Sequence, residues 1–266
     1  MIIAYKFPPM SQTALVTGAS KGIGKAIALR LAHDGFNIIV HYNRSQKEAQ
    51  NVSEEIRKTG RESWIVQADL ADDTSVREMF NTIADDHDSL DLLVNNAGMD
   101  HAKMIEDYTL EEMREVIDVV LFGKISCTKL ALPLLKKSQN PGIINIASRM
   151  GKEKTIPTIG AYGPAEAGVI KWTQCCALEF AQHRIRVNCV APGLTRTSLT
   201  EDIFLDESDG DTDKAESIWN EMAARNPSHR VGKPDDVAGV VSFLASDDAS
   251  YINGETIGVN GGSNLG

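Results

Sequence analysis

The stretch ALVTGASKGIG, residues 14–24, decides the fold. Ala14–Thr17 has the composition of a short buried strand, and the apolar spacing that begins at Gly22 is helical. Glycines between the two elements permit a tight turn and let the backbone approach a pyrophosphate. The first turn of the helix then offers unpaired N–H groups and the positive end of its dipole. The stretch therefore predicts a phosphate-binding strand–loop–helix unit.

The rest of the chain continues this alternation of strands and helices. The expected strands are 14–17, 37–41, 64–67, 92–94, 143–147, 185–190 and 256–259, and the expected helices are 22–33, 45–59, 74–86, 109–136, 164–182 and 235–245. Capping boxes, Ser45 with Glu48 and Thr109 with Glu112, are expected to open two of the helices. Apolar, unalternating strands separated by helices predict an α/β fold of the Rossmann-like, doubly wound type, with a parallel seven-stranded sheet and helices on both faces. No repeat or linker interrupts the pattern, which favours a single domain.

Composition narrows the classes of partner. The chain has 266 residues and a net charge of −10, and an acidic surface disfavours nucleic acid and anionic membranes. No apolar run approaches the roughly 20 residues that cross a bilayer. The cysteines form no C-x-x-C pair and have no histidine cluster beside them, so we expect packing thiols, no metal site and a reducing, cytoplasmic compartment. Residues 1–10 are expected to be an N-terminal extension of the domain at 11–266, with Met10 as an alternative start.

One segment, 197–228, stands apart from the alternation. Its centre, 206–211, is polar and acidic. A long segment of this kind is either a solvated loop or a lid over an active site. We expect 197–228 to be a substrate lid, with the acidic run as a solvated part of it rather than a metal site.

The end of the second strand bears on the choice of cofactor. A carboxylate there would accept from a ribose 2′-hydroxyl and repel a 2′-phosphate. The strand ends Val40-His41-Tyr42-Asn43-Arg44, without such a carboxylate, and Lys21 lies in the glycine loop. Two cations near the adenosine ribose favour NADP(H) over NAD(H), although Arg44 could instead be a solvated residue at a helix start.

Further motifs occur in the order of a known family. They are the loop at 17–24, Asp69 in Ala-Asp-Leu, the turn Asn95–Gly98, Pro192-Gly193 with Thr197, and a C-terminal pattern from Arg230 to Gly262. With them the chain resembles the short-chain dehydrogenase/reductases, especially the bacterial 3-oxoacyl-carrier-protein reductase and glucose dehydrogenase type. The resemblance implies strand order 3-2-1-4-5-6-7, a homotetramer or homodimer, and a small-molecule substrate. The cofactor-binding residues that it implies are Gly18, Ser20, Lys21, Gly22, Ile23, Gly24, Arg44, Asp69, Leu70, Asn96, Ala97, Gly98, Tyr162, Pro192, Gly193 and Thr197.

The resemblance also assigns catalytic roles, and here the sequence departs from the family. Tyr162 matches the tyrosine that exchanges a proton with the substrate oxygen, and Ser148 matches the serine that orients that oxygen. The family's lysine, which holds the nicotinamide ribose and lowers the tyrosine pKa, is Glu166 here, and the asparagine of its water relay is Val120. A carboxylate one helical turn from Tyr162 should raise its pKa above the usual value of about 10. Because reduction needs a neutral phenol, reduction is compatible with Ser148, Tyr162 and Glu166 as the catalytic set, whereas alcohol oxidation is disfavoured.

Three interpretations remain open. The protein reduces a carbonyl group of a small metabolite with NADP(H) and an altered proton relay; or it binds the cofactor with little or no redox activity; or it performs alkene reduction or non-redox chemistry. Lys124, Lys152 and Lys154 are candidates for a replacement cation, although a surface position is the default expectation for each. His101 and Arg149 are candidate pocket residues, Arg149 for an anionic substrate, again with a surface position as the alternative.

Overall fold

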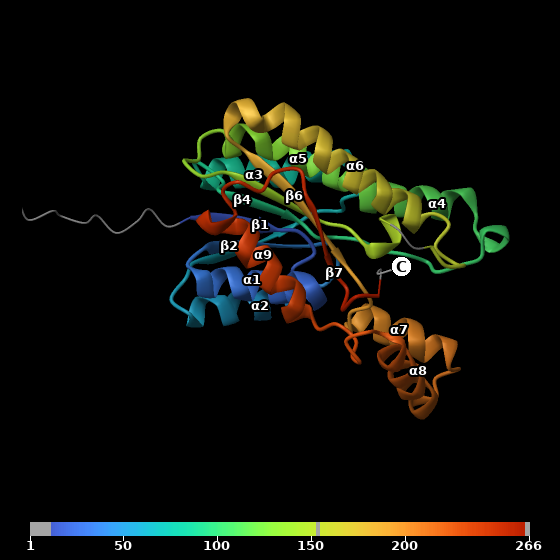
Figure 1. Ribbon diagram of the computed structural model, residues 1–266. Coiled ribbons are helices and arrows are strands. Elements are labelled where there is room, and N and C mark those ends of the chain that lie inside the picture. The colour runs from blue at the N-terminus through green and yellow to red at the C-terminus, as the bar shows by residue number, and fades with distance from the viewer. Residues whose placement is uncertain (1–11, 153–154, 264–266) are drawn as a thin grey trace, which may run out of the picture.

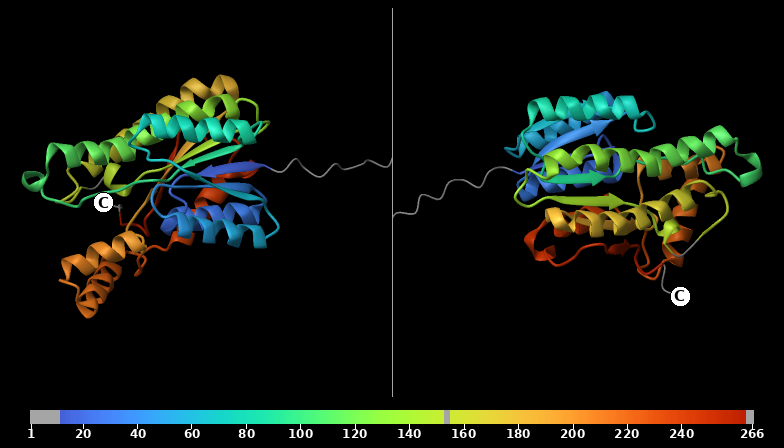
Figure 2. Two further views of the ribbon diagram at one scale, coloured as in Figure 1. Left: turned by 180° about the vertical axis from the view of Figure 1, so that it is seen from behind. Right: turned by 90° about the horizontal axis from the view of Figure 1, so that it is seen from above.

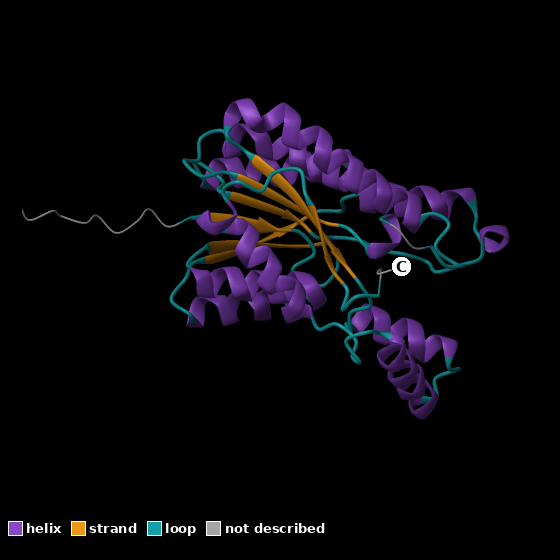
Figure 3. Ribbon diagram, in the orientation of Figure 1, coloured by secondary structure: helices purple, strands orange, loops and turns teal. Residues whose placement is uncertain are grey.

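The computed structural model describes residues 12–152 and 155–263, and its centre is one parallel sheet (Figures 1 and 3). The strands are β1 Thr13–Val16, β2 Asn37–Tyr42, β3 Ser63–Gln67, β4 Leu92–Asn95, β5 Gly142–Ile146, β6 Arg186–Pro192 and β7 Thr256–Val259. Their order is β3-β2-β1-β4-β5-β6-β7, and every pairing is parallel. The predicted fold class and strand order are therefore confirmed. The expected extension at 1–10 and Lys154 lie outside the described residues.

Helices cover both faces of the sheet (Figures 1 and 2). One layer comprises α1 Gly22–Asp34, α2 Gln46–Lys58 and α9 Pro234–Ala245, and the other comprises α3 Asp73–Asp86, α5 Gly123–Leu135 and α6 Tyr162–Phe180. Alternate strand residues face opposite layers: Leu15 and Ile39 pack in one core, and Ala14 and Ile38 in the other. Both faces of each central strand are buried, which explains why the strands do not alternate in polarity.

The expected helix at 109–136 is interrupted. It consists of α4 Leu110–Ile117, a π-helical turn at Asp118–Phe122, and α5. The Thr109 capping box is confirmed, since Thr109 Oγ1 accepts from the Glu112 N–H and the Glu112 carboxylate accepts from the Thr109 N–H. The Ser45 capping box is wrong. Ser45 precedes α2 with φ −92° and ψ 63°, outside the extended conformation typical of an N-cap, and its side chain makes no cap hydrogen bond.

The segment 197–228 contains two helices, α7 Ser198–Glu207 and α8 Thr212–Arg225, so the interpretation as a solvated loop is wrong. Asp211 in the acidic run begins α8, because its carboxylate accepts from the N–H groups of the next turn. Arg196 links the two helices: it donates to Glu201 at 3.0 Å and to Glu216 at 2.8 and 3.2 Å. The pair projects beyond the end of β6 (Figure 1).

A buried polar network joins the two central strands to two helices. Asn95 on β4 and Asn145 on β5 are register partners. Asn95 Nδ2 donates to Asn145 Oδ1 at 2.9 Å and to Thr128 Oγ1 on α5 at 3.0 Å. Asn145 Nδ2 donates in turn to Thr173 Oγ1 on α6 at 2.9 Å. The middle of the sheet is therefore hydrogen-bonded directly to α5 and α6.

Other expectations concern cysteines, metals and membranes. Cys127, Cys176 and Cys189 are buried, as expected of packing thiols, whereas Cys175 is exposed, and all are free thiols. Over residues 12–152 and 155–263, no group of three His, Cys, Asp or Glu side chains is placed to hold a metal ion. None of the helices described there has the length and apolarity to cross a membrane.

Candidate active site

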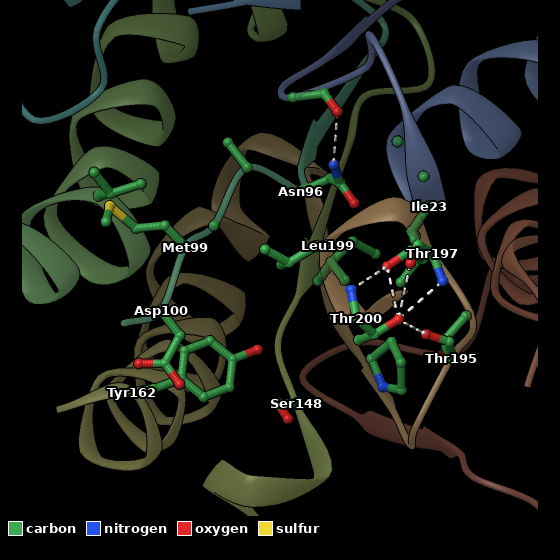
Figure 4. Close-up of a pocket in the computed structure, with 18 of the residues that line it drawn as sticks. Ile23, Asn96, Met99, Asp100, Ser148, Tyr162, Thr195, Thr197, Leu199 and Thr200 are labelled. Carbon is green, nitrogen blue, oxygen red and sulfur yellow. Dashed lines mark hydrogen bonds between the residues drawn. The ribbon is translucent and has the colours of Figure 1, made fainter. Parts of the chain in front are cut away.

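A cavity of about 750 Å³ lies at the carboxyl ends of the strands (Figure 4). The glycine loop, the ends of β2, β3, β4 and β6, the start of α6 and one face of α7 line it. Every residue expected from the sequence to bind cofactor, from Gly18 to Thr197, lines this cavity, and so do Ser148, Tyr162 and Glu166. In open parallel α/β sheets this edge is where ligands bind.

The glycine loop is held by tight backbone packing. Gly18 and Gly22 have φ of +62° and +58°, a region that favours glycine. A Cβ atom on Gly24 would lie 2.3 Å from the Gly18 carbonyl oxygen and 2.5 Å from Asn96 Nδ2. Asn96 fixes the loop from the neighbouring turn by donating from Nδ2 to the Thr17 carbonyl at 2.8 Å. Glycine is therefore required where the loop crosses the end of β4.

His41, which was not predicted from the sequence as a site residue, is hydrogen-bonded to the same loop. Its Nδ1 accepts from the Gly18 N–H at 3.0 Å, and its Nε2 lies 3.2 Å from the Ala68 carbonyl oxygen. Burial lowers the His41 pKa to about 4, so the ring is neutral at physiological pH. Nε2 then carries the proton and donates to Ala68, and the ring connects the glycine loop to the end of β3.

The end of β2 provides the surroundings expected for a 2′-phosphate. Lys21 and Arg44 are both exposed at the cavity, and the cavity-lining residues from 41 to 45 include no carboxylate. Asp69 lies in the neighbouring turn, where Oδ1 accepts from the Ala71 N–H at 3.0 Å. Arg44 follows β2 and Ser148 follows β5, on opposite sides of β1 and β4 in the sheet, so the cationic side chains lie at one end of the cavity.

Tyr162 and Ser148 line the other end. Tyr162 is the first residue of α6, and Ser148 precedes a short 3₁₀ turn, where its Oγ accepts from the Met150 N–H at 3.2 Å. Burial, followed by the charge of Glu166, holds the pKa of Tyr162 well above its usual value, while Ser148 acts in the opposite direction. This is the direction expected from a carboxylate at position 166, and it keeps the phenol protonated.

Glu166 is paired with a lysine from another helix. Its carboxylate Oε2 lies 3.7 Å from Nζ of Lys124, and the two side chains are 3% and 1% exposed. The expectation that Lys124 lies at the surface is therefore wrong: it shares a face of α5 with the buried residues Cys127 and Thr128. Lys152 is exposed, as expected. Val120, in the family's asparagine position, is buried in an apolar cluster.

Comparisons with known proteins match nearly the whole chain to reductases. A family model described as Enoyl-(Acyl carrier protein) reductase matches residues 18–264. The 3-oxoacyl-[acyl-carrier-protein] reductase FabG of Staphylococcus aureus is 38% identical over 253 residues, which cover 95% of this chain and 98% of that protein. The chain belongs to the short-chain dehydrogenase/reductase family.

Solved structures of other short-chain dehydrogenase/reductases share the fold. A short chain dehydrogenase from Burkholderia cenocepacia in complex with NADP superposes with a TM-score of 0.85 at 32% identity, covering 96% of this chain and 98% of that one. YwfH, an NADPH dependent reductase involved in bacilysin biosynthesis, superposes with a TM-score of 0.87 at 30% identity, covering 96% and 99%. The likeness therefore extends to the whole fold.

In this short-chain dehydrogenase/reductase a second carboxylate, which was not predicted from the sequence, lies near Tyr162. Asp100 lines the cavity on the same side as Tyr162 in Figure 4, and its charge also raises the Tyr162 pKa. Asp100 Oδ1 accepts from the Tyr108 hydroxyl and from the His101 N–H, both at 2.9 Å. These donors fix the carboxylate at the cavity wall.

The structure separates the two remaining candidates. His101 does not line the cavity; its Nε2 lies 3.0 Å from Glu115 Oε2. Arg149 does line it, half-buried, and donates from Nη1 to Ser263 Oγ at 3.0 Å. Arg149 therefore remains a candidate for contact with substrate, whereas His101 supports the loop outside the cavity.

Proposed function

We propose that the protein is an NADP(H)-dependent reductase that transfers hydride to a carbonyl group of a small metabolite, with a proton relay that differs from the family's. The observation that carries the proposal is Tyr162, half-buried at one end of the cavity and held neutral beside Ser148 and Glu166, while the glycine loop lines the same cavity. NADPH, when bound, supplies the hydride. The protein supplies the position of the substrate and the proton.

The residues present fit the cofactor. Backbone N–H groups of the glycine loop and the start of α1 suit the pyrophosphate, and Lys21 and Arg44 suit a 2′-phosphate. The family resemblance assigns Asp69 and Leu70 to the adenine, and Asn96–Gly98 to the region between the adenosine and nicotinamide halves of the cofactor. It assigns Pro192, Gly193 and Thr197 to the nicotinamide side; all of these residues line the cavity. The NADP complex of the Burkholderia relative and the NADPH dependence of YwfH support the same choice.

Tyr162 donates the proton to the substrate oxygen. Ser148 Oγ, already fixed by the Met150 N–H, has a hydroxyl proton to donate to the same oxygen and so polarises the carbonyl. With Glu166 raising the Tyr162 pKa, proton donation is retained but phenolate formation is costly. Reduction is therefore the favoured direction, and oxidation of an alcohol, which needs phenolate as the base, is disfavoured.

The wider setting belongs to the same proposal. The α7–α8 segment is the substrate lid, because Leu199, Ile203 and Phe204 line the cavity from α7. The protein works in the cytoplasm as a homotetramer or homodimer, in line with the family and with a chain of free thiols.

The proposal is tested by measuring NADPH oxidation with a panel of ketones, aldehydes, 3-oxoacyl thioesters and enones, with the products identified. Turnover with a carbonyl should fall by roughly 10²–10⁴-fold in Tyr162→Phe, as expected for loss of a general acid, while NADPH affinity by calorimetry is unchanged. Tyr251→Phe, at a fully exposed tyrosine, is the matched control. NADPH binding without turnover of any carbonyl would favour the cofactor-binding interpretation, and saturation of an enone double bond alone would favour alkene reduction.

A further inference from the structure

The buried pair between α5 and α6 has a role that the family pattern does not supply. We propose that the Glu166 carboxylate accepts hydrogen bonds from the hydroxyl groups of the nicotinamide ribose, and that Lys124 is the positioning residue that keeps this carboxylate ionised and oriented. An acid thus stands where the family has its lysine, and a lysine lies on the neighbouring helix. The inference rests on the proposed NADP(H) site. It assigns to two residues on two helices the ribose contact that one lysine makes in the family, but not that lysine's lowering of the tyrosine pKa.

The burial of Lys124 requires a partner. Lysine is almost never fully buried without one, because desolvation of an unpaired ammonium costs several kcal/mol. Lys124 is 1% exposed, and Glu166 is the acid beside it, at 3.7 Å. The close approach is built into the helices: a Cβ atom on Gly168 of α6 would lie 2.9 Å from Leu121 Cδ2, in the π-helical turn just before Lys124. The two charges thus meet near a close approach of α6 to that turn.

The pair leaves the carboxylate with unused capacity. At 3.7 Å the Lys124 contact is longer than a hydrogen bond, and Glu166 Oε2 is buried without a hydrogen-bond partner among the described residues. An unsatisfied buried carboxylate oxygen is costly. Glu166 also lines the cavity one helical turn from Tyr162. Vicinal hydroxyl groups that enter the cavity beside Tyr162 would donate hydrogen bonds to this carboxylate. A lysine side chain at the same position has no acceptor atom and could not receive them.

The surroundings of Glu166 define what Lys124 must offset. The groups facing it are Lys124 from α5, Tyr162 from α6, Asp100 from the segment after β4, and the buried thiol of Cys189 on β6. Burial raises the Glu166 pKa and Asp100 adds to this, while Lys124 is the group that opposes it most strongly. Without Lys124 the carboxyl would become neutral and lose its strength as an acceptor. Lys124 therefore acts through Glu166 rather than on the substrate.

The experiment is a cycle of Lys124→Met, Glu166→Met and the double variant, with Lys129→Met and Glu179→Gln as controls on exposed positions of the same helices. Two readouts need no turnover: the Tm of the apoprotein and the affinity for NADPH by calorimetry. Breaking a buried pair from one side should lower Tm by roughly 6 °C or more, and the Met/Met variant should recover most of this loss.

Ligand affinity separates a functional role from a structural one. Met/Met should bind NADPH about 10-fold or more weakly, because a charge-assisted acceptor is lost, yet bind adenosine 2′,5′-bisphosphate, which has no nicotinamide ribose, as the wild type does. A Met/Met variant that recovers Tm and keeps full NADPH affinity would overturn the proposal and leave the pair purely structural. Equal losses for both ligands would overturn it as well.

A second variant tests the exchange itself. Lys124→Glu combined with Glu166→Lys restores an ammonium beside Tyr162. NADPH affinity should then recover from that of the Met/Met variant towards that of the wild type. The alkaline limb of the pH profile of kcat should move to lower pH, because an ammonium lowers the pKa of Tyr162. A profile unchanged by the exchange, or by Lys124→Met alone, would contradict the role of Lys124. If the wild type turns over no carbonyl, the proposed function fails, while the affinity and Tm measurements still decide on the pair.

Discussion

The two ends of the cavity are built on different principles. At the proposed cofactor end, where Lys21 and Arg44 are exposed, backbone geometry fixes the shape: the glycine loop, with its positive φ angles and the Gly24–Gly18 approach, is locked to the Asn96 turn. At the proposed catalytic end, charged side chains on separate elements surround Tyr162: Asp100 and Glu166 line the cavity, and Lys124, which does not line it, pairs with Glu166. Backbone geometry tolerates little substitution, whereas a charge can be moved from one helix to a neighbour that faces the same point. The loop can therefore match the family closely while the residues around Tyr162 differ.

The largest expected effect in this comparison concerns Ser148, the proposed catalytic serine. Ser148→Ala removes the hydroxyl that polarises the carbonyl, so kcat should fall by roughly 10²–10³-fold. NADPH affinity should stay within about twofold, because the cofactor end is untouched. Stopped-flow hydride transfer and calorimetry give the two numbers, with the exposed Ser250→Ala as control. A parallel loss of affinity and rate would show that the two ends are not independent.

A pH titration of stability tests the cofactor end alone. The His41 pKa is about 4 in the folded protein against 6.5 when unperturbed, so between these values the unfolded chain binds more protons. Stability is full above pH 6.5 and is lost as the pH falls towards 4, by about 3 kcal/mol for this group. Urea unfolding at several pH values measures it.

The matched variant for this titration is His41→Asn, whose amide oxygen can still accept from the Gly18 N–H without titrating. Subtracting the variant's curve from the wild type's isolates His41 from Glu166, whose raised pKa acts in the opposite direction. Identical curves for the two proteins would remove His41 as the acid-sensitive support of the loop.

Cofactor preference should change by a smaller amount. Arg44→Ala removes one exposed cation at the site expected for the 2′-phosphate, so NADPH should bind about 10-fold more weakly while NADH affinity is unchanged. Arg77→Ala, at an exposed arginine on α3, should change neither. Similar losses for NADPH and NADH would mean that Arg44 contacts a group common to both.

The smallest expected effect concerns Asp100. Asp100→Asn removes one of the charges that raise the Tyr162 pKa, so that pKa falls. The rate of reduction, which needs the protonated phenol, should then begin to fall at a lower pH than in the wild type. The rate of alcohol oxidation should rise, but only a few-fold, because solvent screens the partly exposed Asp100 charge. Asp107→Asn, at an exposed position of the 3₁₀ turn Ile105–Asp107, is the control. A shift of the alkaline limb to higher pH would contradict this account.

Local patterns predicted most of the fold. The strand–loop–helix at 14–24 and the Thr109 capping box depend on nearby residues, and both are confirmed. The strand order came from the family resemblance. For the segment 197–228 the acidic centre left a solvated loop open as the alternative to a lid, but Asp211 there caps a helix. Aspartate is favoured both at helix N-caps and in turns, so composition alone could not distinguish the two.

The charged part of the site was harder to predict, because it depends on packing between helices. Lys124 was judged by residue type and expected at the surface. Its spacing from Cys127, Thr128 and Ala131, which follow at three, four and seven residues, was a signal that it shares their buried face. His41 gave no such signal. Its role arises from Gly18 and Ala68, which only the folded sheet brings to the two sides of its ring.

The asparagine–threonine network in the middle of the sheet has a consequence for the Lys124–Glu166 pair. Thr128 lies one turn beyond Lys124 on α5, and Thr173 lies two turns beyond Glu166 on α6, so each threonine is on the same side of its helix as the charge. Hydrogen bonds to Asn95 and Asn145 prevent either helix from rotating about its own axis, where a slip of one residue would turn a side chain by about 100°. The angle at which lysine and glutamate meet is thus set by side chains of the two central strands β4 and β5, one helical turn from Lys124 and two turns from Glu166.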